Sequence, residues 1–352
     1  MSLKVLFVGG TGNISLSCVA EAVKAGCGVS VFNRGATGAL LPEGVESIAG
    51  EMGDARYREL GRSGFDVVCQ FIAFTPEQIV NDIEVFSRGA GQYVFISSAS
   101  VYQKPPRHYV ITEKTPAVNP YWPYSQNKIA CETALMATRG LTWTIVRPSH
   151  TVRTILPTVF NEGDALGRRL IAGKPVIVAG DGATPWTLTR CADFALPFVG
   201  LFGKRDAFGE VFHITSDNAY TWDDITKTSA AGLEVKADIV HIPTDTPIRY
   251  LPDWEGPLMG DKTWAALFDN AKVKSVVGDF PCVKDLGELL AEPIASFKAR
   301  LKSDGPKMSD RDALMDRVAR EQRSLGTSVG GGRRRLAAPA PSPIPRRVGW
   351  RR

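Results

Sequence analysis

The fold of this chain is decided by residues 4–15, which read KVLFVGGTGNIS. Lys4–Val8 is an almost continuous apolar run, and such runs are typical of a parallel strand that is buried on both faces. A glycine-rich turn follows at once and opens a helix-like segment, Ser15–Ala25. Glycines let the backbone approach a pyrophosphate, and the first N–H groups of a helix attract an anion. We therefore expect this turn to bind a dinucleotide through Gly9, Gly10, Thr11, Gly12, Asn13 and Ile14.

Further β-type runs and helix-like stretches alternate along the first 150 residues. The β-type runs are 29–32, 45–49, 66–73, 93–97 and 142–147, and the helix-like stretches are 54–62, 76–88 and 123–138. Such alternation indicates βαβ units, and right-handed crossovers then wind helices onto both faces of a parallel sheet. The predicted fold class is therefore α/β, a doubly wound parallel sheet of the Rossmann type with a smaller C-terminal α/β substrate lobe.

The chain is expected to divide into three parts. Residues 1–150 are predicted to form the dinucleotide-binding Rossmann domain, with some later segments returning to it. Prolines and glycines break the following stretch into shorter pieces, so 151–302 are predicted to form the substrate lobe. Residues 303–352 are predicted to be a helix, exposed over Ser309–Gln322, and a disordered basic tail. The tail, 330–352, holds seven arginines and no acidic residue and has little apolar surface to bury.

Composition excludes several classes of protein. The 352 residues are 44% apolar with a mean hydropathy of −0.07, and no apolar run approaches the ~18–20 residues of a membrane span. The N-terminus is too strand-like for a signal peptide, so we expect a cytoplasmic protein that binds no membrane. Six scattered cysteines and four histidines predict neither a disulfide scaffold nor a metal site. The net charge of +5 belongs to the tail, because without its seven arginines the chain carries −2.

The end of the second β-type run bears on the choice of cofactor. It reads Phe32-Asn33-Arg34-Gly35. Sites that prefer NAD place an Asp or Glu here to bind the ribose 2′-hydroxyl, whereas a nearby arginine accommodates the 2′-phosphate of NADP. The acid is missing and Arg34 is present, which favours NADP over NAD. The alternative is that Arg34 is a surface residue of a turn.

A tyrosine and a lysine four residues apart, Tyr124 and Lys128, lie in the helix-like stretch that starts near Pro123. This spacing places both on one helix face. A phenol has a pKa of about 10, and an adjacent ammonium lowers it by favouring the phenolate. Ser98 and Ser100 follow the fifth β-type run, where a hydroxyl can bind a substrate oxygen. The set predicts proton exchange with a hydroxyl or carbonyl group.

Together, these motifs resemble the extended short-chain dehydrogenase/reductase superfamily in its NAD-dependent epimerase/dehydratase branch, over about residues 3–300. The stretches VFNRG, FISSASVY, NPYWPYSQNKIACE, TIVRPSHT and FHITSD resemble a bacterial group related to the chloroplast stem-loop RNA-binding proteins. The resemblance implies that Ser98, Tyr124 and Lys128 are catalytic and that Lys128 also holds the nicotinamide ribose. It further implies cofactor contacts at Gly9, Thr11, Gly12, Asn13, Ile14, Asn33, Arg34, Ala73 and Pro148.

The region expected to bind substrate departs from the nucleotide-sugar epimerases. Trp186 takes the place of the arginine that pairs with the sugar diphosphate in that branch, and Arg190 follows one helical turn later. This argues against a UDP- or dTDP-sugar and favours a smaller sugar or an apolar carbonyl compound. His213 is expected in the core of the smaller lobe. The candidate substrate residues are Ser100, Ser149, His150, Trp186 and Arg190.

The function predicted from these residues is an NAD(P)-dependent oxidoreductase or epimerase that acts on a sugar or a related carbonyl or alcohol. Ala99 follows Ser98 where dehydratases carry an acid, which makes that subclass less favoured. The expected partner is a small-molecule substrate, and a homodimer is left open. The alternative is an RNA-binding protein on a Rossmann scaffold, which the arginine-rich tail and the family relatives favour. Only this alternative has a nucleic-acid partner.

Overall fold

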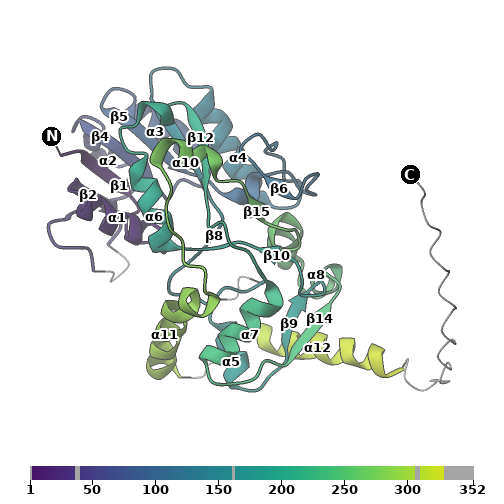
Figure 1. The fold of residues 1–352 in the computed structure, drawn as a ribbon. Helices are drawn as coiled ribbons and strands as arrows, with labels where there is room; N and C mark the ends of the chain where they lie inside the picture. The colour runs from purple at the N-terminus through teal and green to yellow at the C-terminus, as the bar shows by residue number, and fades with distance from the viewer. Residues whose placement is uncertain (1, 36–39, 161–162, 306–309, 329–352) are drawn as a thin grey trace, which may run out of the picture.

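A computed structural model describes residues 2–35, 40–160, 163–305 and 310–328. Its centre is a seven-stranded parallel sheet in the order β12-β7-β5-β4-β1-β2-β3 (Figure 1). The strands are β1 (Lys4–Val8), β2 (Gly28–Asn33), β3 (Glu46–Ala49), β4 (Phe65–Gln70), β5 (Ala90–Ile96), β7 (Trp143–Pro148) and β12 (Glu210–Ile214). The strand order reverses at β1, and ligands of such sheets bind beyond the carboxyl ends of the strands at this point.

Helices cover both faces of the sheet, as the alternating sequence predicts. One face carries α1 (Ser15–Lys24), α6 (Cys191–Gly200) and α10 (Ala271–Val277), and the other carries α2 (Ala55–Leu60), α3 (Pro76–Phe86) and α4 (Pro123–Met136). Within β1, Val5 and Phe7 pack on the first face and Leu6 and Val8 on the second. The unbroken apolar run therefore reflects a strand buried on both sides.

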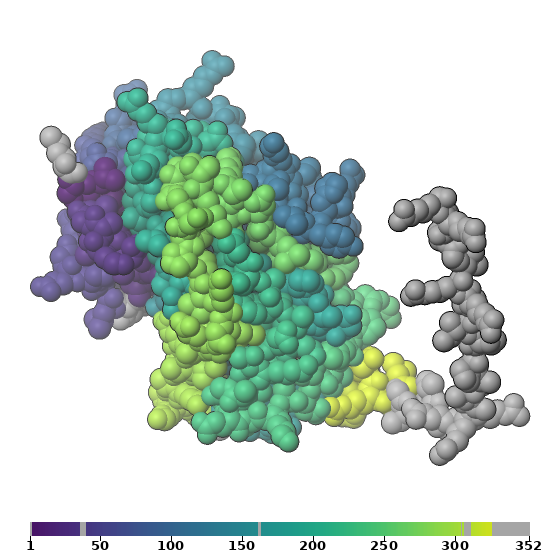
Figure 2. All heavy atoms as spheres, viewed as in Figure 1, coloured from purple at the N-terminus to yellow at the C-terminus, as the bar shows by residue number. Residues whose placement is uncertain are grey.

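The smaller lobe has a hydrophobic core of its own and packs against the sheet domain (Figure 2). Its strands form short pairs, β8 (His150–Val152) with β11 (Leu188–Arg190), β9 (Val176–Ala179) with β14 (Ile239–Ile242), and β10 (Pro185–Trp186) with β13 (Tyr220–Thr221). Its helices are α5 (Ala165–Ile171), α7 (Trp222–Gly232), α8 (Asp245–Tyr250), α9 (Glu255–Pro257), α11 (Leu286–Asp304) and α12 (Asp310–Ser328). A fourth pair, β6 (Val110–Ile111) with β15 (Leu267–Phe268), joins the lobe to the sheet domain.

The C-terminal helix corrects one expectation. The predicted helix is present as α12, but it is not a free, exposed segment, because Met315, Val318 and Ala319 are buried in the core of the lobe. The helix lies against β9 and β14. The predicted tail, 330–352, lies outside the described residues.

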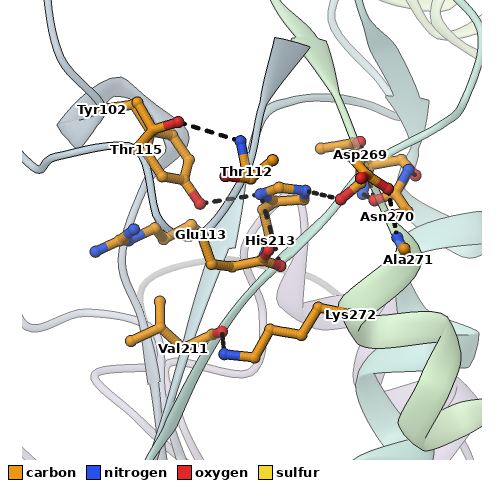
Figure 3. A network of polar contacts seen from close by, with 12 residues as sticks. Tyr102, Thr112, Glu113, Thr115, Val211, His213, Asp269, Asn270, Ala271 and Lys272 are labelled. Atoms are coloured by element: carbon orange, nitrogen blue, oxygen red, sulfur yellow. Dashed lines mark hydrogen bonds and ion pairs between the residues drawn. The ribbon is translucent and has the colours of Figure 1, made fainter.

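His213 corrects a second expectation. It lies on β12 at the edge of the large sheet, not in the core of the smaller lobe. Its Nε2–H donates to the carbonyl oxygen of Asp269 at 2.8 Å, so its Nδ1 accepts from the Tyr102 hydroxyl at 2.9 Å (Figure 3). The ring is thus a neutral connector between the sheet and the segments that carry β6 and β15.

A buried carboxylate, Asp82 of α3, holds the segment after β4 in place. It accepts hydrogen bonds from the hydroxyls of Tyr57 and Tyr93, both at 2.6 Å, and from the Gln70 amide. The side-chain oxygen of Gln70 accepts from the N–H of Ile72 at 2.8 Å. Burial outweighs these bonds and raises the pKa of Asp82 to about 6.

This raised pKa predicts the sign of a pH effect on stability. Between about pH 4 and pH 6 the folded protein binds a proton at Asp82 more tightly than the unfolded chain, so the unfolding free energy falls as the pH rises. An Asp82→Asn variant lacks this titration. The unfolding free energy of the wild type should therefore fall relative to that of the variant, by on the order of 2–3 kcal/mol over this range. Urea unfolding from pH 4 to pH 7 measures this, with exposed Asp206→Asn as the control, and a constant difference would contradict it.

Candidate functional site

Two cavities meet at the carboxyl ends of the sheet strands. The larger has a volume of about 780 Å³ and extends from the glycine-rich turn to Tyr124 and Lys128. The smaller, of about 260 Å³, lies between the sheet domain and residues 261–268. Both cavities are lined by Ser98, Tyr124, Pro148 and Ser149. The predicted serine and tyrosine thus lie where the two cavities join.

The glycine-rich turn forms one end of the larger cavity. Of its predicted cofactor contacts, the residues that line the cavity are Gly9, Thr11, Gly12, Asn13 and Ile14. Gly10 does not line it, because Gly10 lies against the core, where an added Cβ would come within 2.7 Å of Val31. The Ser15 hydroxyl, which stands at the position of the usual third glycine, accepts from the Gly12 N–H at 2.9 Å.

The same turn presents an anion-binding helix end to the cavity. Helix α1 begins at Ser15. Its N-cap residue is Ile14, whose side chain accepts no hydrogen bond from the first N–H groups of the helix. Those N–H groups and the helix dipole are the donors that hold a phosphate group. The turn is tied to the smaller lobe because the side chain of Arg153 donates to the carbonyl oxygen of Asn13 at 2.9 Å.

The end of β2 lies further along the same cavity. Asn33 and Arg34 both line it, and the Asn33 side chain accepts from the N–H of Gly35 at 2.7 Å, which fixes the turn. Arg34 is exposed and makes no hydrogen bond or ion pair with any described residue. Its guanidinium is therefore available to an anion at this end of the cavity.

Helix α4 carries the tyrosine and the lysine. It is fixed against β7 by a buried pair in which the Arg147 guanidinium donates to both carboxylate oxygens of Glu132, at 2.9 and 2.5 Å. Such two-pronged pairs define orientation as well as energy. Tyr124 and Lys128 therefore keep one orientation toward the carboxyl ends of the strands.

Lys128 is buried and donates to main-chain groups instead of a carboxylate. Its ammonium donates to the carbonyl oxygens of Ala73 and Ile96, each at 2.8 Å. Ala73, a predicted cofactor contact, is buried and contacts the lysine through its carbonyl oxygen. It does not line the cavity. Burial lowers the pKa of Lys128 to about 8.

The electrostatics of Tyr124 differ from the simple expectation. Burial raises the pKa of its phenol, and a hydrogen bond with the Ser98 side chain opposes this rise. The Lys128 ammonium lies 6.0 Å from the centre of the tyrosine ring, and its bonds are directed to the two carbonyls. In the protein alone, the phenol is therefore kept in its neutral, proton-donating form.

The Ser98 hydroxyl belongs to a chain of three serine hydroxyls. Its Oγ lies 2.9 Å from the Oγ of Ser100, which in turn accepts from the Ser125 hydroxyl at 2.7 Å. Ser98 and Ser100 both line the smaller cavity. The chain of hydroxyls places the Ser98 oxygen at the junction of the two cavities.

Three of the five predicted substrate residues line the smaller cavity, namely Ser100, Ser149 and His150. Trp186 lies behind them and donates from its Nε1–H to the Nδ1 of His150 at 3.0 Å. The Trp186 side chain is buried and stacks on Trp222. Arg190 pairs with Asp193 at 2.6 Å and lines neither cavity.

Burial and the nearby Lys262 ammonium lower the pKa of His150 to about 3. The ring is therefore neutral, with its proton on Nε2, because Nδ1 accepts from Trp186.

Several residues of the smaller cavity escape analysis of the sequence. They are Lys104, Trp122, Asp261 and Lys262. Trp122 lies within a quoted family stretch, but the lysines and the aspartate belong to no motif. They are brought to Tyr124 by the pairing of β6 with β15 and by Asn119, whose side chain donates to the carbonyl oxygens of Ser100 and Gly260.

No group of three or more metal-ligating side chains occurs among the described residues. The six cysteines, all within the described ranges, are free thiols. Within the part of the chain that the structure describes, no helix is long and apolar enough to cross a membrane.

Comparisons with known proteins support an NAD(P)-binding domain on a fold shared with known epimerases. Residues 9–159 match a family model described as NAD(P)H-binding. The chain is 29% identical over 256 residues to the chloroplast stem-loop binding protein of 41 kDa b of Arabidopsis thaliana, a match that covers 68% of this chain and 65% of that protein. It is 26% identical over 280 residues to the 2′-dehydrokanamycin reductase of Streptomyces kanamyceticus, covering 76% of this chain and 77% of the reductase. The structure of UDP-glucose 4-epimerase from Thermotoga maritima superimposes with a TM-score of 0.68 at 19% identity, over 85% of this chain and all of that one.

The close packing behind the glycine-rich turn leads to a stability prediction. Gly9 has a φ of +88°, and an added Cβ would overlap the side chain of Ile72. Gly9→Ala should lower the unfolding free energy by roughly 2–5 kcal/mol, because it adds overlap to the left-handed strain. The matched control is Gly26→Ala, where φ is +81° but nothing lies within 4 Å, so only the strain of ~1–2 kcal/mol applies. Urea unfolding compares the two, and equal losses would show that the contact with Ile72 is not tight.

Proposed function

We propose that this chain, whose residues 9–159 match a family model described as NAD(P)H-binding, is an NADP-preferring oxidoreductase or epimerase. Its proposed substrate is a sugar or a related carbonyl or alcohol compound. The observation that carries the proposal is that Ser98 and Tyr124 line both cavities. A cofactor in one cavity and a substrate in the other would meet at the groups suited to move a proton.

The larger cavity fits a nicotinamide dinucleotide. The uncapped first turn of α1 would hold the pyrophosphate, and Arg34 would face the 2′-phosphate of the adenosine ribose. Lys128 would hold the nicotinamide ribose at the other end. When bound, the nicotinamide supplies or accepts the hydride.

The residues of the chain have separate roles in the proposed reaction. The Tyr124 hydroxyl gives its proton to the substrate oxygen in reduction and takes it back in oxidation. Its raised pKa suits donation, since the phenol remains protonated around neutral pH. Ser98 donates a hydrogen bond to the same substrate oxygen and orients it. Trp122, whose ring centre lies 5.0 Å from that of Tyr124, helps to keep water from the junction.

Both proposed reaction outcomes have a named relative. The reductase of Streptomyces kanamyceticus is an example of the first outcome, net reduction. The epimerase of Thermotoga maritima is an example of the second, in which the hydride would return to the same carbon. The buried position of Trp186 in place of a diphosphate-binding arginine supports a substrate smaller than a nucleotide sugar.

A second candidate function, RNA binding, is favoured by the match to the chloroplast stem-loop binding protein. That match spans 65% of the length of the chloroplast protein. The arginine-rich stretch, 330–352, would supply the phosphate contacts. Filter binding separates the two functions, because RNA affinity that falls steeply with salt and disappears on deletion of 330–352 reflects charge on the tail alone.

The cofactor preference is the first test. NADPH should bind roughly tenfold or more tightly than NADH, because Arg34 can form charge-assisted hydrogen bonds with the 2′-phosphate. Arg34→Ala should remove this preference and leave NADH affinity nearly unchanged, whereas Arg88→Ala, an exposed arginine outside the cavity, should leave both. Fluorescence titration with each nucleotide measures the constants. Equal affinities in the wild type would refute the preference.

The role of Tyr124 is the second test. Tyr124→Phe should reduce turnover about 10²–10⁴-fold, because it removes the positioned acid, while NADPH affinity stays close to that of the wild type. Lys128→Ala should weaken both turnover and NADPH binding. Steady-state rates at 340 nm and the same titrations measure the two effects. Full activity in Tyr124→Phe would exclude the proposed chemistry and bring RNA binding forward.

A further inference from the structure

The smaller cavity is lined by two buried ammonium groups. The side chains of Lys104 and Lys262 are only 4% and 5% exposed. Lys104 precedes β6, and Lys262 ends the helical turn η4 (Leu258–Lys262), which precedes β15. Since β6 pairs with β15, two segments about 150 residues apart in sequence bring these lysines to one cavity.

The cavity does not neutralise this charge. The Lys104 ammonium makes no hydrogen bond or ion pair with any described residue. The one contact of the Lys262 ammonium with an acid is with Asp261 at 3.4 Å. The charged side chains of the lining are therefore two ammoniums and one carboxylate. His150 is neutral in the tautomer that Trp186 imposes, and Tyr124 is a neutral phenol.

The aromatic surroundings of Lys262 give it little compensation. Its ammonium lies 6.0 Å from the ring centre of Trp122 and 5.9 Å from that of Trp186, at the outer limit of a cation–π contact. Burial lowers the pKa of both Lys104 and Lys262. A buried charge is costly unless it is paired, so an excess ammonium in a cavity is best accounted for by an anion that enters it.

We propose that this cavity binds the carboxylate or phosphate of an acidic, sugar-sized substrate through Lys104 and Lys262, with the reacting carbon held toward Tyr124. The inference rests on the proposed function and narrows its substrate to one chemical class. The volume of about 260 Å³ is below the ~300–1,000 Å³ that drug-sized ligands fill, so a single sugar ring with one acidic group suits it. The Asp261 carboxylate repels the anion of the substrate. It would accept hydrogen bonds from neighbouring hydroxyl groups of the same substrate.

The test uses the full-length protein saturated with NADP⁺ and a matched set of probes. Isothermal titration compares D-glucuronate and D-glucose 6-phosphate with neutral D-glucose and cationic D-glucosamine. At least one anion should bind about tenfold or more tightly than glucose, and glucosamine should bind most weakly. The carboxylate and phosphate arms identify which acidic group is preferred. Equal binding of glucose, or no binding of either anion, overturns the proposal.

Variants assign the effect to the two lysines. Lys104→Gln and Lys262→Gln should each weaken binding of the preferred anion about tenfold or more, with little change for glucose. Lys236→Gln, at an exposed lysine of the smaller lobe, is the matched control and should change nothing. Asp261→Asn should act in the opposite direction and tighten anion binding, a gain that misfolding cannot imitate. Loss of the anion preference in the Lys236 variant, or weaker binding in Asp261→Asn, overturns the assignment.

The result is separable from the test of the proposed function. NADPH affinity, measured in the same variants, should remain unchanged because neither lysine lines the larger cavity. A protein that binds NADPH but no anion retains the proposed function and loses this inference. A protein that binds no nicotinamide nucleotide loses the proposed function, whatever its response to anions.

Discussion

The site depends on one buried ammonium group, that of Lys128, and on the two main-chain carbonyls that hold it. Ala73 follows β4 and Ile96 ends β5, so their bonds to the lysine join two neighbouring strand ends to helix α4. Carbonyl dipoles without a carboxylate partner satisfy the ammonium but leave it a net positive charge. That charge borders the larger cavity, and the same helix carries Tyr124 one turn earlier. The position of the tyrosine at the junction of the cavities therefore follows from how the lysine is buried.

In the proposed function, the larger cavity recognises the cofactor and the smaller cavity recognises the substrate. The larger is formed mostly by the sheet domain, whose strand ends and α1 supply the groups that suit a dinucleotide. The smaller takes Asp261, Lys262 and Phe268 from segments that pack over the sheet domain. Variation in these covering segments can change the substrate without moving Ser98 or Tyr124. The positive charge of the smaller cavity is the feature by which this chain would select its substrate.

Residues close together in sequence account for most of what could be predicted. The strand–turn–helix of residues 4–24 and the spacing of Tyr124 and Lys128 are local patterns, and the structure has the corresponding elements at these places. Another local pattern, the capping box of Thr221 and Asp224, opens α7. Local patterns also predict dinucleotide binding, and the match of residues 9–159 to an NAD(P)H-binding family model supports it. The roles of the site residues remain predictions.

Long-range pairing accounts for what sequence analysis missed. β12 returns to the large sheet beside β7, which places His213 at its edge, and no local signal marks that return. Trp186 points into the core and donates a hydrogen bond to His150. Its stacking partner, Trp222, comes from a distant segment, so no local pattern shows that Trp186 is buried. Lys104 and Lys262 resemble ordinary surface lysines in sequence, and only the pairing of β6 with β15 buries them together. The proposed meeting of a nicotinamide cofactor and substrate at Tyr124 is tested most directly by a crystal structure with NADP⁺ bound. We expect the 2′-phosphate beside Arg34 and the nicotinamide ring at the junction of the cavities, facing the Tyr124 hydroxyl. A nicotinamide ring held elsewhere, out of reach of Tyr124, would contradict it.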